Sequence, residues 1–204
     1  MSFETIIAFA IACFALMAVP GPGVLATVGR GLAHGLGRTL IFILGIVAGD
    51  LIYLFLTIFG LAALASVYGE VFVVIRWVGA AYLVYLGIKA WRAPAVPLDS
   101  TSVAPANPVR DFMGGLSMTL GNPKVILIYT AFLPTFIDLT ALSHSDIAIA
   151  AAVVSGVLFF IMAGYAWLAD RSRQIFRSER AVRIMNRSAG TVLVGAGVVI
   201  AARQ

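Results

Sequence analysis

Long blocks of apolar residues with few charges alternate along this chain with short polar stretches. Six such blocks cover residues 5–29, 39–66, 71–91, 112–137, 147–169 and 188–202. A helix needs about 20 predominantly apolar residues to cross a bilayer, and only the last block is short for this. The pattern predicts an all-α, polytopic membrane protein with six transmembrane helices.

Proline and glycine interrupt the first and fourth of these predicted helices. The two runs are Pro20, Gly21, Pro22 and Gly23, and Gly121, Asn122, Pro123 and Lys124. Proline lacks an N–H and its ring clashes with a carbonyl of the preceding turn, which costs ~3 kcal/mol or more in a helix interior. A membrane tolerates a broken helix only where protein or a water-filled cavity satisfies the freed backbone groups. We therefore expect both helices to be broken at their proline motifs and to line a cavity; simple proline kinks are the alternative.

The composition agrees with a membrane protein. Charged residues make up only 11% of the 204 residues and hydrophobic residues 61%, whereas soluble domains are ~25% charged. The net charge of +5 comes from basic residues between the apolar blocks, so membrane topology explains it and nucleic acid is not expected as a partner. Residues 1–204 are predicted to form one transmembrane domain in a lipid bilayer.

Few residues suit catalysis or metal binding. His34 and His144 fall in loops predicted on opposite sides of the membrane, and Cys13 is the only cysteine. The common motifs of hydrolases and phosphate-binding loops are missing from the sequence. We expect no metal, no cofactor and no enzyme activity. An intramembrane enzyme acting on lipid or peptide is the weaker alternative, since only Asp50 and Lys124 would be available as catalytic groups.

Basic residues gather in the loops after the first, third and fifth predicted helices. Eleven of the fourteen lie there: Arg30, Arg38, Lys89, Arg92, Arg110, Arg171, Arg173, Arg177, Arg180, Arg183 and Arg187. Short loops rich in Lys and Arg stay in the cytoplasm. Both termini are therefore predicted to lie outside the cytoplasm.

The two halves of the chain echo one another faintly. Residues 1–92 form the first predicted repeat, residues 93–111 a polar linker with several prolines, and residues 112–204 the second repeat, with Pro22 corresponding to Pro123. Because each half has three helices, an odd number, the two repeats would be inverted across the membrane. Inverted repeats with paired broken helices place their substrate near the midplane.

Two charged residues lie deep within predicted helices. Each costs ~2.5 to 3.5 kcal/mol on insertion scales. Counted from the predicted cytoplasmic ends, Asp50 and Lys124 each lie about 12 residues in, roughly 18 Å at 1.5 Å per residue. We expect them to form a coupled pair in which Asp50 exchanges a proton when substrate arrives. A purely structural ion pair or hydrogen bond is the alternative.

Several short motifs together resemble one family. They are Pro20-Gly21-Pro22, Gly49-Asp50, the run from Trp77 to Trp91 that contains Tyr85-Leu86-Gly87-Ile88, Asn122-Pro123-Lys124, and Phe132-Leu133-Pro134. Over nearly the whole chain this combination resembles the LysE/RhtB family of bacterial amino-acid exporters. The resemblance implies efflux of amino acids or close derivatives, such as homoserine, threonine, leucine or lysine, across the inner membrane and driven by the proton gradient. The third-helix run looks more like the homoserine/threonine branch.

A zwitterionic amino acid needs partners for both of its charges. The predicted substrate-binding residues are Pro20, Gly21, Pro22, Gly23, Asn122, Pro123 and Lys124. Restarting helices offer N–H groups to a carboxylate, and the helix ends at Val19 and Gly121 offer carbonyls to an ammonium group. Asp50 is predicted to couple transport to protons by antiport.

Other functions stay open. The same fold could carry a substrate that is not an amino acid, or the chain could be a channel or structural protein without coupled transport. Gly45 and Gly49 form a small-residue face that suits internal packing or a homodimer.

The predicted orientation can be tested with reporters. A reporter that is active only in the cytoplasm, fused after Gln204, is expected to stay inactive, and a periplasmic reporter at the same place should be active. Cytoplasmic activity would contradict six spans and favour five, with residues 188–202 lying on the surface.

Overall fold

The computed structural model describes residues 1–61, 69–94, 107–137, 142–171 and 178–202. The end of the second apolar block, most of the predicted linker, and Asp138, Arg173, Arg177 and Arg203 lie outside these ranges.

The described residues form helices and no strands, which confirms the all-α prediction. The elements are α1 (Phe3–Met17), α2 (Pro22–Leu56), η1 (Thr57–Leu61), α4 (Gly69–Arg92), α5 (Pro108–Leu120), α6 (Pro123–Leu127), η2 (Ile128–Phe132), η3 (Leu133–Thr135), α7 (His144–Arg171) and α9 (Glu179–Ala202). Of these, η1 and η2 are π-helical turns and η3 is a 3-10 turn.

Several helices are long and apolar enough to cross a membrane. Three qualify alone within the described ranges: Pro22–Gly60, His144–Arg171 and Glu179–Ala202. A fourth qualifies if Pro108–Leu120 and Pro123–Thr135, which bend by 52° at the second proline motif, count as one span. These lengths and compositions support a multi-pass membrane protein, with three or four candidate spans on this criterion.

The last helix differs from the prediction. The sequence predicted a basic loop or an interfacial helix over residues 170–187 before the apolar block 188–202, whereas α9 is one helix of 24 residues that begins at Glu179. Arg180, Arg183 and Arg187 therefore lie on its first turns, where they are exposed. Arginine is a good helix former, and Val182 supplies the buried face of these turns, so the basic run continues the apolar helix.

A sharp corner replaces the predicted loop between the first two apolar blocks. The chain is helical up to His34, turns at Gly35 and is helical again immediately after it. Gly35 has φ of 74°, a left-handed conformation that glycine adopts without steric cost. The Leu36 N–H donates to the Asp170 carboxylate at the end of α7 (3.3 Å), which holds this corner against α7. The prediction of a loop around His34 was therefore wrong.

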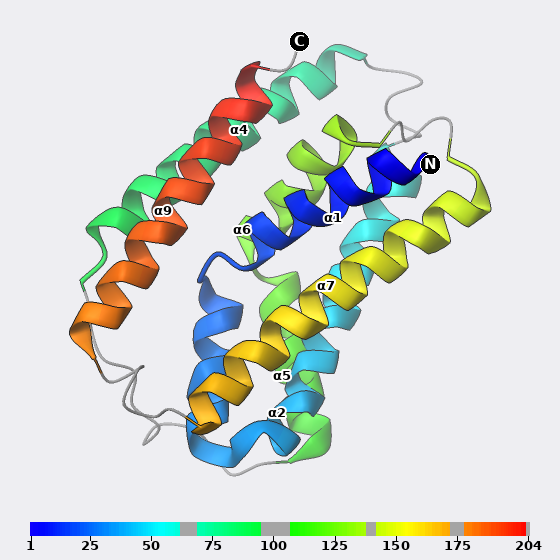
Figure 1. Cartoon of the computed structure of the whole chain (residues 1–204). Coiled ribbons are helices and arrows are strands. Elements are labelled where there is room, and N and C mark those ends of the chain that lie inside the picture. Colours follow the sequence, from blue (N-terminus) through cyan, green and yellow to red (C-terminus); the bar gives the residue numbers. More distant parts are fainter. Residues whose placement is uncertain (62–68, 95–106, 138–141, 172–177, 203–204) are drawn as a thin grey trace.

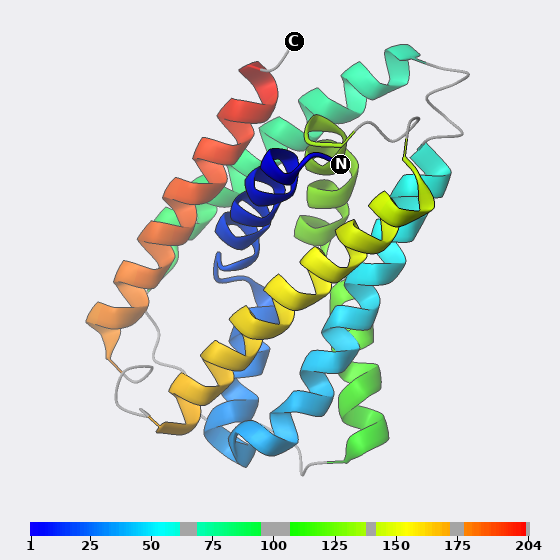
Figure 2. The same cartoon turned by 45° about the vertical axis from the view of Figure 1, so that its right-hand side comes forward.

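The helices form two groups (Figure 1). The larger contains α1, α2, α5 and α7 around a core that includes Phe9, Val28, Ile43 and Val154. In both views α4 and α9 lie side by side at one edge (Figure 2), and a second core with Leu83 joins them to α1 and η2.

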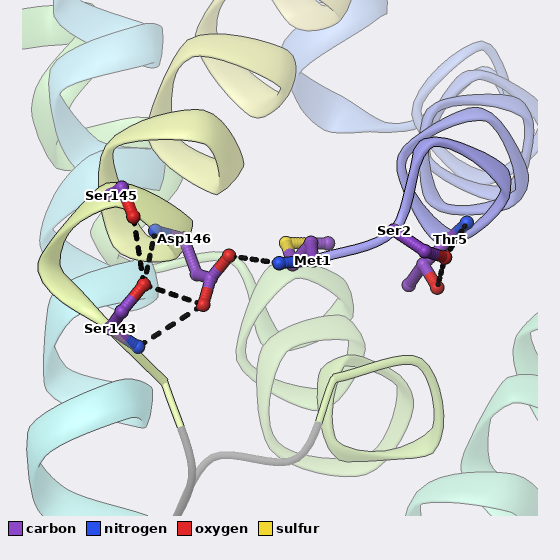
Figure 3. A network of polar contacts seen from close by, with 6 residues as sticks. All are labelled: Met1, Ser2, Thr5, Ser143, Ser145 and Asp146. Carbon is purple, nitrogen blue, oxygen red and sulfur yellow. Dashed lines mark hydrogen bonds and ion pairs between the residues drawn. The ribbon is translucent and has the colours of Figure 1, made fainter.

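Polar contacts fix both ends of the helical bundle. At one end the terminal amine of Met1 forms an ion pair with Asp146, which also accepts a hydrogen bond from the Ser143 hydroxyl (2.7 Å; Figure 3). At the other end Arg30 of α2 pairs with the buried Asp111 of α5 (2.5 Å). The start of α1 thus lies beside the start of α7. The part of α2 around Arg30, before the Gly35 corner, lies beside the start of α5.

Glycines let α2 and α5 touch through their backbones. A Cβ atom added at Gly45 would lie 2.0 Å from the Phe112 carbonyl oxygen, and one added at Gly115 would lie 2.1 Å from the Phe42 carbonyl oxygen. Distances this short leave no space for a side chain. The predicted small-residue face of α2 is therefore occupied within the chain, so it gives no support to a homodimer.

Substitutions at this crossing test the close approach. Gly45→Ala is expected to destabilise the protein by about 1 to 3 kcal/mol, the usual cost of overpacking. Gly164→Ala in α7 is the matched control, because a Cβ there meets nothing within 4 Å and alanine favours a helix by up to ~1 kcal/mol over glycine. The midpoint of thermal unfolding in mild detergent should fall for Gly45→Ala only. Equal midpoints for the two variants would contradict the backbone contact.

Candidate functional site

The first proline motif breaks the chain between α1 and α2. Helix α1 ends at Met17, and α2 begins at Pro22 after Gly21, whose backbone is extended (φ −142°, ψ −174°). Proline suits a first helical position because the N–H it lacks would have no helical partner there. The break therefore covers residues 18–21, and the predicted discontinuous helix is confirmed at this motif.

The second motif breaks the chain between α5 and α6. Gly121 ends α5, and the Asn122 side-chain oxygen caps the next helix by accepting the Lys124 N–H (3.1 Å). Helix α6 then begins at Pro123. The sequence predicted that Asn122 binds a ligand. In the structure its side-chain oxygen is used to cap α6.

A single hydrogen bond joins the two breaks. The Lys124 ammonium donates to the Val19 carbonyl oxygen at 2.9 Å, and the lysine side chain runs alongside Gly21. Lys124 is only 9% exposed. The sequence predicted a free Val19 carbonyl for the ammonium group of a ligand; in this structure the protein's own ammonium group occupies it.

Tyrosines satisfy neighbouring carbonyls at the same breaks. The Tyr165 hydroxyl of α7 donates to the Ala18 carbonyl (2.9 Å), and the Tyr53 hydroxyl of α2 donates to the Leu120 carbonyl (2.5 Å). Sequence reasoning missed both tyrosines. Their role depends on contacts between helices and leaves no pattern along the chain.

Asp50 lies on α2 beside both breaks and is 5% exposed. It is close to Lys124, but none of the ion pairs recorded among the described residues joins the two. Its carboxyl group also lies next to the Tyr129 hydroxyl, without a hydrogen bond of normal geometry between them. The predicted pairing of Asp50 with Lys124 stays a prediction, although both side chains face one space.

That space is a cavity between the two breaks. Its volume is about 50 Å³, well below the roughly 300 to 1,000 Å³ of sites that hold a small molecule, so the cavity is nearly closed in this conformation. Its lining includes the predicted residues Gly21, Gly23, Asp50, Asn122 and Lys124. The predicted Pro20, Pro22 and Pro123 do not line it: they set the ends of the helices, and Pro20 borders a neighbouring hollow beside Tyr165.

Most of the remaining lining is apolar and was not predicted. Apart from Val19, whose carbonyl was predicted to face a ligand, it consists of Met17, Val24, Ile46, Met118, Thr119, Val125, Ile128, Leu158 and Met162. Proximity to the proline motifs could have indicated Met17 and Met118, but nothing in the sequence pointed to Leu158 and Met162 of α7. The cavity therefore combines one acid, one ammonium group, one amide, the Thr119 hydroxyl and an apolar wall.

The described residues contain no group of three or more His, Cys, Asp or Glu side chains that could hold a metal ion.

Comparisons with known proteins find related membrane proteins. The family model of the LysE type translocators matches residues 14–204. An uncharacterized membrane protein of Synechocystis sp. is 34% identical over 202 residues, which cover 97% of this chain and 96% of the relative. The leucine efflux protein of Klebsiella pneumoniae is 30% identical over 192 residues (93% and 91%), and the homoserine/homoserine lactone efflux protein of Salmonella typhimurium is 29% identical over 204 residues (100% and 99%). No solved structure matches the chain.

A double-mutant cycle tests whether Asp50 and Lys124 act on each other. Removing either charge leaves the other buried, so the double variant Asp50→Asn with Lys124→Gln should lose less stability than the sum of the single losses, by roughly 0.5 to 3 kcal/mol. Thermal unfolding in detergent measures this. In the control cycle Arg30→Gln replaces the lysine change; Arg30 pairs with Asp111, so the two losses should add. A double variant whose loss equals the sum of the two single losses would remove the support for the pair.

Proposed function

The chain belongs to the LysE type translocator family, and on that premise we propose that it exports a small amino acid or a close derivative across the bacterial inner membrane by proton antiport. As a translocator of this family it is a transporter and not an enzyme. The observation that carries the proposal is the meeting of two helix breaks, one carboxyl group and one ammonium group at a single buried cavity.

The cavity lining favours a short or medium aliphatic amino acid. Leu158 and Met162 give the space an apolar wall, while Asn122 and Thr119 are the polar uncharged side chains that border it. Relatives named for leucine efflux and for homoserine and homoserine lactone efflux fit the same chemistry. Homoserine, threonine and leucine are therefore the first substrates to test, and a substrate other than an amino acid is the alternative.

The two charges of a zwitterion have separate partners around the cavity. The unpaired N–H groups at the start of α2 favour a carboxylate, and the Lys124 ammonium lies against the same backbone at Gly21. Asp50 supplies the full negative charge for the substrate ammonium. In this binding mode Lys124 turns from the Val19 carbonyl towards the carboxylate, and the substrate ammonium takes the freed carbonyl.

We propose six spans, arranged as two inverted repeats of three helices. In this arrangement α1 and the first half of α2 form one span with a break in its middle, as α5 and α6 do. The Met1–Asp146 contact and the Arg30–Asp111 pair support it, since they join segments that the topology puts on the same side. The basic residues favour the cytoplasm for the Arg30 side, with both termini outside.

The coupling cycle follows from the position of Asp50. A proton from outside neutralises the carboxylate and weakens its hold on the substrate ammonium, which is released. One repeat then rocks against the other, and the proton leaves to the cytoplasm before the next substrate binds. One proton enters for each substrate that leaves by this site, which makes the exchange an antiport.

Flux in proteoliposomes tests the proposal. Asp50→Asn is expected to abolish uphill transport under an imposed pH gradient, because the amide cannot take up the coupling proton. Lys124→Met and Pro123→Ala should each lower flux at least about tenfold, the effect of losing ~1.4 kcal/mol at the site. Radiolabelled homoserine, threonine and leucine are followed with and without the gradient.

The control for the flux assay is Glu4→Gln, which neutralises an exposed carboxylate away from the cavity and should behave like the parent protein. Uphill transport by Asp50→Asn under the gradient would show that another group carries the proton.

A further inference from the structure

The Tyr129 hydroxyl is buried and lies beside the Asp50 carboxyl group without a hydrogen bond of normal geometry. Tyr129 is 2% exposed, and its hydroxyl makes no hydrogen bond among the described residues. Its ring stacks on that of Tyr53, with centroids 6.4 Å apart and planes 19° apart, so packing fixes the side chain. Buried hydroxyl groups are nearly always hydrogen-bonded, so an unpaired one beside a transport site calls for a function.

The backbone around Tyr129 is also unusual. Tyr129 belongs to η2, a π-helical turn directly after α6. Such turns are rare and occur frequently at functional sites, because the extra residue rotates the side chains that follow. Here the turn buries Tyr129 against the ring of Tyr53, which follows Asp50 on α2 by three residues, and so places the Tyr129 hydroxyl beside the Asp50 carboxyl group.

Asp50 has three polar neighbours on three other elements. Lys124 of α6 faces it but donates to Val19, and Cys13 of α1 has only a weakly donating thiol. The third is Tyr129, which lies beside Asp50 and is not among the residues that line the cavity. The neighbouring Tyr53 hydroxyl is occupied by the Leu120 carbonyl.

We propose that Tyr129 is a positioning residue for Asp50: its hydroxyl donates to the charged carboxylate while Lys124 is held on Val19, and so sets the pH at which Asp50 takes up its proton. This inference rests on the proposed role of Asp50 in coupling. The hydrogen bond exists fully only with the ionised carboxylate, because a protonated carboxyl is a poorer acceptor. Tyr129 therefore favours the charged form that binds the substrate ammonium group.

The test compares Tyr129→Phe with Tyr53→Phe. Both variants keep the stacked rings, but only the first removes the hydroxyl beside Asp50. In proteoliposomes without a gradient, the pH at half-maximal substrate exchange is expected to rise by about one unit in Tyr129→Phe, since protonation of Asp50 becomes about tenfold easier. Tyr53→Phe is expected to lose stability, because the Leu120 carbonyl loses its donor, but to keep the pH at half-maximal exchange of the parent protein. An unchanged profile in Tyr129→Phe would overturn the proposal.

Infrared titration gives a second readout that needs no transport. The carbonyl stretch of protonated Asp50 is identified as the band that Asp50→Asn lacks. Tyr129→Phe should shift the midpoint of this band to higher pH by about one unit, and Tyr53→Phe should leave it unchanged. The same midpoint in Tyr129→Phe and in the parent protein would contradict the proposed hydrogen bond from Tyr129 to Asp50.

The two proposals fail in distinguishable ways. Gradient-driven transport by Asp50→Asn would reject coupling through Asp50, whereas the infrared midpoint reports on Tyr129 independently of that result. A shifted band together with an unshifted exchange profile would show that the tyrosine contacts Asp50 but does not control transport, and would overturn the proposed role.

Discussion

The structure depends on satisfying the backbone groups that the two helix breaks set free. An unpaired carbonyl in a membrane costs several kcal/mol, because no water is there to bond it. At these breaks three carbonyls accept a hydrogen bond from a side chain of another helix: Tyr165 donates to Ala18, Lys124 to Val19, and Tyr53 to Leu120. The donors come from α7, α6 and α2, so the breaks hold three helices in register around the cavity.

The close helix crossing follows from the same requirement. A tyrosine can reach the carbonyl at the end of the neighbouring helix only if the two helices run close together. Gly45 and Gly115 allow this for α2 and α5, and the Thr119 hydroxyl adds a hydrogen bond to the Ile46 carbonyl (3.3 Å). Gly45 and Gly115 therefore affect the site indirectly, because they allow the short distance between α2 and α5 that the Tyr53–Leu120 hydrogen bond needs.

The sequence predicted what depends on local chemistry. Proline in an apolar segment marks a break whatever surrounds it, and a charge in such a segment marks a polar site, so both breaks, Asp50 and Lys124 were found. The Gly35 corner was missed because basic residues around it suggested a loop, while a single left-handed glycine is enough to turn the chain. The continuity of the arginine run with the last apolar helix was missed for a related reason: the charges suggested a separate loop or interfacial helix, whereas α9 contains both the arginines and the apolar segment.

What the sequence could not supply is the set of donors at the breaks. Tyr165 and Ala18 are 147 positions apart, and Lys124 and Val19 are 105 apart. No periodicity relates residues so distant, and their side chains meet only once the helices have packed. The same holds for Tyr129, which looks like any aromatic residue in an apolar helix until the fold puts it beside Asp50.

The bond from Lys124 to Val19 also bears on how tightly a substrate can bind. If the substrate ammonium takes the Val19 carbonyl as we propose, it replaces an existing hydrogen bond instead of making one to an empty acceptor. Such an exchange gives little net energy, because the carbonyl is satisfied before and after. The gain must then come from Asp50 and from the lysine's new contact with the carboxylate. A site arranged this way binds weakly once Asp50 is protonated, and weak binding on the outer side is what an exporter needs in order to release its substrate.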